Sequence, residues 1–223
     1  MSFTGSIGNG FGRVLAALVR LLTLSGVHPN ALTLIGLLVN GVAAWILARG
    51  EFLYAGLIIL SAAVFDLTDG AVARSANKVT RFGGFLDSVM DRYSDLILLT
   101  GLLVHYARIE RFSYMVLTAV VMTGTVLVSY SRARAENLIP KCKVGFMERP
   151  ERIVLLIIGA LFDRMAPVLW VMAVLSNLTV VHRIVHTWKE SRKLAQVEDS
   201  GSVAAAESGA TGQAELQEGY RSV

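Results

Sequence analysis

The sequence is poor in charge and in cysteine. Only 17% of its 223 residues are charged and 54% are hydrophobic, whereas charged residues make up about a quarter of a typical soluble domain. A chain this apolar is poorly suited to water alone, so a membrane is the first hypothesis. The single cysteine, Cys142, excludes an internal disulfide and a cysteine–histidine metal cluster.

The chain also lacks a basic stripe of the kind that binds nucleic acid. Its net charge is +4, but the basic residues are spread between apolar runs, so we expect no nucleic-acid partner. The first residues do not have the pattern of a secretory signal peptide. Instead, Arg13 and Arg20 share one face of residues 9–24, and the other face is apolar. We therefore expect residues 1–27 to hold an amphipathic helix in the membrane interface.

Six apolar segments follow, and they predict an all-α integral membrane bundle of six transmembrane helices with the N-terminal interfacial helix. The run 31–48 carries no charge and approaches the roughly 20 residues that a span needs. The predicted helices cover residues 31–48, 52–74, 85–107, 112–130, 150–162 and 165–187. We expect residues 28–190 to form the six-helix transmembrane domain, and the polar residues 191–223 to form a disordered tail.

The distribution of basic residues predicts the orientation of these spans. Fifteen of the 21 lysines and arginines would lie on one side of the membrane and four on the other. Basic residues concentrate on the cytoplasmic side of membrane proteins. We therefore expect a multi-pass protein of the cell inner (cytoplasmic) membrane, with both termini and the acidic segment 66–74 facing the cytoplasm.

Four aspartates, at the end of the second predicted helix and the start of the third, form the most informative pattern. Asp66 and Asp69 are three residues apart and share one face of the second helix. Asp87 and Asp91 are four apart and share one face of the third. Because a short loop joins these helices, the four carboxylates can converge. Asp95, one turn further on, either supports this site or pairs with Arg92.

Four carboxylates at the edge of hydrocarbon need cations to neutralise them. Ligands that are all oxygen suit Mg²⁺, Mn²⁺ or Ca²⁺ and not zinc. Two such ions between the two acidic faces could hold a pyrophosphate. Gly70 would let a ligand approach the backbone, and Arg74 would offer a forked donor to phosphate.

The segment from Asp66 to Asp91 resembles the CDP-alcohol phosphotransferase (CDP-alcohol phosphatidyltransferase) family. It matches the signature D-x2-D-G-x2-A-R-x8-G-x3-D-x3-D at each of its eight fixed positions. The resemblance implies that Asp66, Asp69, Asp87 and Asp91 bind two Mg²⁺ or Mn²⁺ ions. It implies that Asp91 is also the general base, that Gly70, Ala73 and Arg74 line the CDP site, and that the enzyme is a homodimer.

The implied reaction transfers a phosphatidyl group from CDP-diacylglycerol to an alcohol, with release of CMP. The stretches Ser129 to Glu136, Glu148 to Arg152 and Asn177 to Ile184 resemble the branch of the family that makes phosphatidylinositol phosphate from inositol phosphate. In that branch, basic residues at the positions of Arg132, Arg152 and Arg183 would bind the phosphate of the acceptor. The alternative reading of these arginines is ordinary anchoring at the cytoplasmic side.

Three other functions remain open on the sequence. One is the phosphatidylglycerol-phosphate branch of the same family, whose acceptor, glycerol phosphate, is also anionic. The second is a cation transporter, although transporters place their acids near the bilayer midplane and in repeated halves. The third is a membrane scaffold with an inactive site, which the complete set of four aspartates argues against.

Overall fold

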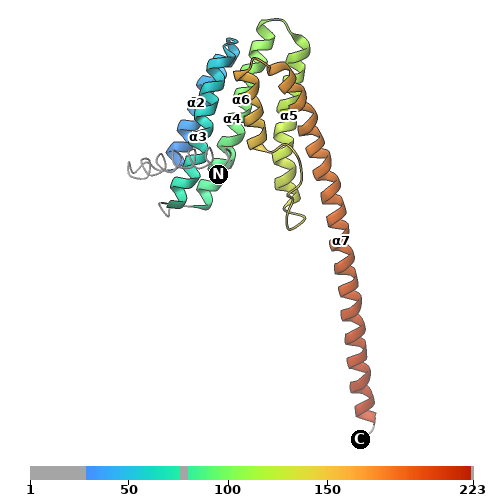
Figure 1. The fold of residues 1–223 in the computed structure, drawn as a ribbon. Coiled ribbons are helices and arrows are strands. Elements are labelled where there is room, and N and C mark those ends of the chain that lie inside the picture. The colour runs from blue at the N-terminus through green and yellow to red at the C-terminus, as the bar shows by residue number, and fades with distance from the viewer. Residues whose placement is uncertain (1–28, 76–79, 222–223) are drawn as a thin grey trace, which may run out of the picture.

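The computed structural model describes residues 29–75 and 80–221, with the side chains of residues 30–66 and 80–196. This part of the chain is all helical (Figure 1). The expected interfacial helix at 9–24 lies outside the described residues. The helices are α2 (Pro29–Ala48), α3 (Phe52–Ser75), α4 (Arg81–Arg108), α5 (Phe112–Ala135), α6 (Arg149–Leu161) and α7 (Met165–Arg221).

The six described helices form a bundle. Helices α2, α3 and α4 make one group, α5 and α7 make another, and α6 contacts both. Helix α2 packs against both α3 and α4, while α5 packs against α4 and α7. The short helix α6 lies between these groups and contacts α3 and α7 (Figure 1). Because α6 touches a helix of each group, residues at its start can reach side chains from both.

Lipid-facing surface covers much of this bundle. Three of the described helices are long and apolar enough to cross a membrane, over Asn30–Ala48, Phe112–Ala135 and Met165–Gln196. Large apolar side chains such as Leu38, Trp45 and Phe112 are exposed on the outside, as expected for a protein whose solvent is lipid. Helix α6 has 13 residues, which corresponds to about 20 Å and is shorter than a full span.

The helix boundaries agree with the sequence in most places and differ at three. Helix α4 begins at Arg81 and not near Phe85, because the hydroxyl of Thr80 accepts a hydrogen bond from the backbone N–H of Gly83 at 2.9 Å and caps the helix. Helix α5 continues to Ala135. The tail that we expected to be disordered from residue 191 is instead a continuation of α7 to Arg221. That segment has no proline and is rich in alanine and glutamate, which favour helix.

Candidate active site

Charged side chains from α3, α4 and α6 meet at one end of the bundle. Arg149, the first residue of α6, donates from Nη2 to Asp66 Oδ2 at 2.6 Å. Its Nη1 lies 3.0 Å from Oδ1 of Asp91. One guanidinium therefore joins the acidic faces of α3 and α4. The spacing of the aspartates predicted that these two faces converge.

The structure describes the side chains of only some of the other residues predicted to bind metal or CDP. Asp87 lies one turn before Asp91 on α4 and is half-buried. Asp69, Gly70, Ala73 and Arg74 lie on the last turns of α3, and their side chains are outside the described residues. Gly36 of α2 lies beside this site, since a Cβ there would come within 2.9 Å of Oδ1 of Asp66.

The acidic end of the bundle offers carboxylate oxygens from two helices, at Asp66 and Asp91. Among the described side chains, no group of three carboxylate, histidine or cysteine ligands is arranged around a metal position. A cationic group nevertheless lies between Asp66 and Asp91, namely the guanidinium of Arg149. Carboxylate oxygens that gather around one positive charge are also the ligands that Mg²⁺ and Mn²⁺ prefer.

A cavity of about 140 Å³ adjoins the acidic residues. It is lined by residues of α4, α5, α6 and α7 together with Glu148. Asp91 and the three arginines expected to bind the acceptor contribute to the same wall, and the lining comprises Asp91, Arg92, Asp95, Val128, Ser129, Arg132, Glu148, Arg149, Pro150, Arg152 and Arg183. The structure thus brings together the expected base and the three expected acceptor-binding residues.

Arg183 is held rigidly in this cavity wall. It is 2% exposed although it is among the largest side chains in the protein. Its guanidinium donates to the backbone carbonyl of Val144 at 2.9 Å and to that of Val128. A third contact, at 3.0 Å, joins Nη2 to Oε1 of Glu148. Because partners on α5 and on the loop before α6 hold it, Arg183 presents a fixed positive charge to the cavity.

Glu148 links Arg183 to the more exposed Arg132. The same oxygen of Glu148 lies 3.1 Å from Nη1 of Arg132, and Arg132 also contacts Glu136 at 3.1 Å. Glu148 precedes α6 directly, and its backbone N–H donates to the side chain of Glu151 at 3.0 Å. This hydrogen bond caps the start of α6 and fixes the position of its first residue.

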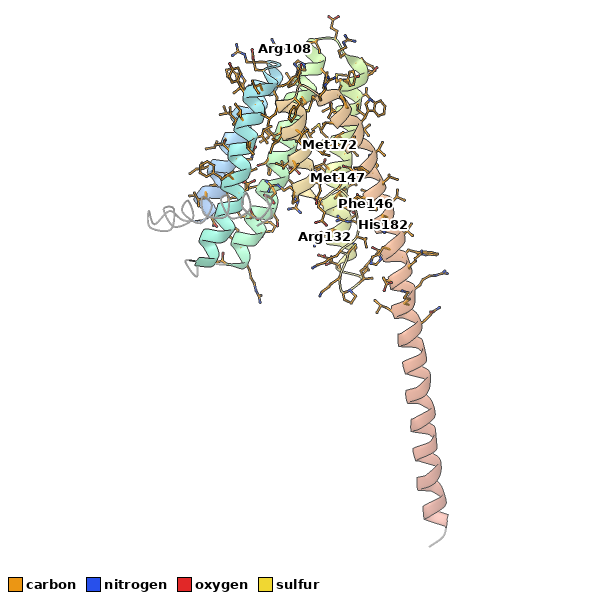
Figure 2. All side chains as sticks on the ribbon, in the orientation of Figure 1. Arg108, Arg132, Phe146, Met147, Met172 and His182 are labelled. Atoms are coloured by element: carbon orange, nitrogen blue, oxygen red, sulfur yellow. The ribbon has the colours of Figure 1, made fainter. Side chains whose placement is uncertain are left out.

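The loop before α6 is docked on α7. The hydroxyl of Thr179 accepts hydrogen bonds from the backbone N–H groups of Phe146 and Met147, both at 3.1 Å. The ring of Phe146 stacks on that of His182 with centroids 5.9 Å apart. Figure 2 shows Phe146, His182 and Arg132 in the same region, far from Arg108 at the other end of the bundle. These contacts fix the loop against α7 and so fix the positions of Glu148 and Arg149 in the site.

Two residues of this site were not identified from the sequence. Arg149 was not expected to meet the acidic motif, and Glu148 was not expected to bridge two arginines. Both lie in the Glu148-to-Arg152 stretch whose resemblance to the family was noted, but spacing within that stretch does not say which side chain reaches α3. Asp95 pairs with Arg152, at 2.5 Å, and this contact replaces the pairing with Arg92 that the sequence left open.

The similarity of this chain to known proteins agrees with the site. Residues 26–188 match the profile of the family described as CDP-alcohol phosphatidyltransferase. The match covers well over half of the chain, so the chain belongs to this family. It is therefore a membrane-bound, multi-pass transferase of phospholipid biosynthesis. The enzyme and its reaction class, expected from the aspartate motif, are confirmed, and the cation transporter is not supported.

Three individual similarities are informative. The chain is 37% identical to archaetidylinositol phosphate synthase of Pyrococcus horikoshii over 174 residues, which are 78% of this chain and 86% of the relative. A crystal structure of Mycobacterium tuberculosis phosphatidylinositol phosphate synthase with CDP-DAG bound superposes with a TM-score of 0.73 and 29% identity, over 79% of this chain and 94% of that one. Another structure of that enzyme, in complex with manganese and citrate, has a TM-score of 0.70 and 29% identity, covering 78% and 88%.

Proposed function

We propose that this enzyme transfers the phosphatidyl group of CDP-diacylglycerol to inositol phosphate and releases CMP, as a phosphatidylinositol phosphate synthase does. The observation that supports a phosphorylated acceptor is the cavity in which Arg132, Arg152 and Arg183 surround a space next to Asp91. Three guanidinium groups suit an acceptor that carries a phosphate monoester. The relatives named for inositol phosphate chemistry support the same acceptor.

In this proposal, the acidic faces of α3 and α4 hold two divalent ions, Mg²⁺ or Mn²⁺. Asp66, Asp69, Asp87 and Asp91 would be their ligands. The carboxylates that already surround the Arg149 guanidinium support such a site, as does the manganese complex of the mycobacterial enzyme. When bound, divalent ions stabilise the negative charge that develops on the pyrophosphate and on the leaving group.

Asp91 is the proposed general base, because it belongs to the acidic face and also lines the cavity. It would accept the proton of the attacking hydroxyl. The hydroxyl oxygen then forms a bond to the β-phosphorus of the donor. The bond from this phosphorus to the bridging oxygen breaks, and CMP leaves with the electron pair. Gly70, Ala73 and Arg74, on the last turns of α3, would line the CDP site.

We further propose a homodimer in the cytoplasmic membrane, with the active site facing the cytoplasm. The orientation is supported by the bias of basic residues toward the end of the bundle that carries the cavity. The dimer rests on the family resemblance, and the mass of the protein in detergent would test it.

The direct test is CMP release by the purified protein with CDP-diacylglycerol and Mg²⁺. Inositol phosphate, inositol, glycerol phosphate and serine are offered separately, and Asp91→Asn serves as the blank. Release with inositol phosphate alone, abolished in the variant, is the expected result. Release with glycerol phosphate alone would overturn the acceptor and move the enzyme to the phosphatidylglycerol-phosphate branch. Release with inositol but not its phosphate would contradict the role of the three arginines.

A further inference from the structure

Asp95 is the one buried carboxylate among the described side chains, and the family motif does not include it. It lies on α4 one turn beyond Asp91. Its Oδ2 accepts a hydrogen bond from Nη2 of Arg152 at 2.5 Å, and both side chains are 3% exposed. A buried pair of this kind gains little stability for its cost of desolvation, so a role in the geometry of the site is the more informative explanation.

Arg152 has donors to spare after this contact. A guanidinium carries five N–H groups, and Nε and Nη1 of Arg152 are buried without a hydrogen-bond partner. Buried donors are nearly always paired in proteins, and Arg152 lines the cavity beside Asp91. Two donors of a side chain that lines the cavity therefore lack a protein acceptor, and a ligand with acceptor oxygens would supply one.

The other two arginines of the cavity differ from Arg152 in this respect. Arg183 already donates to two backbone carbonyls and contacts Glu148. Arg132 contacts Glu136 and Glu148 and is 36% exposed at its side chain. Arg152 alone of these three has both a single anchoring partner and unpaired buried donors. The orientation of Arg152 therefore depends mainly on one residue, Asp95. The orientation of Arg183 is shared among three partners.

We infer that Asp95 is a positioning residue that holds Arg152 so that its Nε and Nη1 donors bind the phosphate group of the acceptor. The inference rests on the proposed function, since it assumes an acceptor with a phosphate. It requires only a phosphate monoester, whichever alcohol carries it. Asp95 does not touch the substrate in this scheme. Its Oδ1 also lies 3.8 Å from Nε of Arg149, but its effect on acceptor binding passes through the shorter contact with Arg152.

The test uses steady-state CMP release by the full-length protein, with saturating CDP-diacylglycerol and varied inositol phosphate. The variants are Asp95→Asn, Arg152→Gln and the double variant. Asp163→Asn is the matched control, because this exposed aspartate follows the opposite end of α6. A second titration varies CDP-diacylglycerol at fixed acceptor, and the melting temperature of each variant is measured.

We expect Asp95→Asn to raise the KM for inositol phosphate by about 10- to 100-fold, since a charge-assisted hydrogen bond to the acceptor is weakened. The kcat and the KM for CDP-diacylglycerol should change much less, and Asp163→Asn should behave as the wild type. The double variant should be no worse than Arg152→Gln alone. A fall in kcat with an unchanged acceptor KM would overturn the inference, and so would losses that multiply in the double variant.

Asp95→Asn leaves Arg152 as a buried charge without its partner, so that variant can fail to fold. The double variant removes both charges and avoids this, and its acceptor KM relative to that of Arg152→Gln then decides the question. Equal values support action through Arg152, and a further rise contradicts it. Failure of the proposed function would be separate and visible in the wild type. If the wild-type enzyme used glycerol phosphate, the same comparison of variants would be made with that acceptor. If the wild-type enzyme used an acceptor without a phosphate, the inference would be wrong.

Discussion

The two ends of the helix bundle are held together by different forces. At the end that carries Tyr106, buried apolar residues from α2, α4 and α5 pack closely, and a Cβ on Gly101 would come within 2.3 Å of the backbone oxygen of Ala44. At the end that carries the cavity, buried Asp95, Arg152 and Arg183 are fixed by ion pairs and hydrogen bonds. Close packing contributes stability, whereas paired charges mainly determine where functional groups lie.

The largest expected effect is on activity, at the charged end. Asp91→Asn removes the proposed base and should lower kcat by about 10²- to 10⁴-fold. The melting temperature should change little, because Arg149 keeps its contacts with Asp66 and Asp95. CMP release and thermal unfolding of the same preparation check both statements. Activity within about threefold of the wild type would exclude Asp91 as a general base.

The next effect is on stability, at the apolar end. Gly101→Ala would force α4 away from the backbone of Ala44, and overpacking of this kind costs about 1–3 kcal/mol. The melting temperature in detergent should fall, and the KM values of the folded fraction should stay near those of the wild type. Gly41→Ala on α2 is the matched control, since a Cβ there meets nothing within 4 Å. Equal melting temperatures for the two variants would contradict the close approach of α2 and α4.

A third variant, Arg149→Gln, tests the electrostatic balance of the acidic face. Arg149 lies close to Asp66, Asp91 and Asp95, so its loss leaves these carboxylates to repel one another. We expect a lower melting temperature in EDTA and a larger stabilisation by added Mn²⁺ than in the wild type, as measured by thermal unfolding. Direct titration with Mn²⁺ should also show tighter binding, because the competing guanidinium is absent. A melting temperature in EDTA equal to that of the wild type would show that Arg149 does not neutralise this face.

The smallest effect is expected for an exposed pair. Lys193 contacts Glu190 at 2.7 Å one turn away on α7, but its side chain is 68% exposed. Exposed pairs of this kind contribute little, because solvent and salt screen them. Lys193→Ala should leave both the melting temperature and CMP release unchanged. A clear loss of either would mean that charge pairs at the surface of α7 matter as much as those in the cavity.

Much of this architecture could be predicted from local patterns. The predicted segments 31–48 and 150–162 correspond to α2 and α6 almost residue for residue, because runs of apolar residues bounded by turns require only local information. Beyond residue 191, composition suggested a disordered tail, and the structure continues α7 to Arg221 there.

The acidic motif was also accessible from the sequence, since its spacing puts two aspartates on one face of each helix. The partners of these aspartates were not. Arg149 lies 83 residues from Asp66, and Arg152 lies 57 residues from Asp95. Periodicity says which residues share a face of a helix, but it does not say which face of α6 turns toward α3 and α4.

Hydropathy and helix propensity are local properties of the chain, so the sequence alone was enough to predict a helical membrane protein and the positions of its helices. The spaced aspartate motif is local too, and its resemblance to the family supplied the reaction class. Three contacts could be seen only in the folded chain: Arg149 joins the two acidic faces, Glu148 bridges two arginines, and Asp95 holds Arg152. These contacts depend on how five helices are rotated and seated against one another. That arrangement is set by the packing of the whole bundle and not by any single segment.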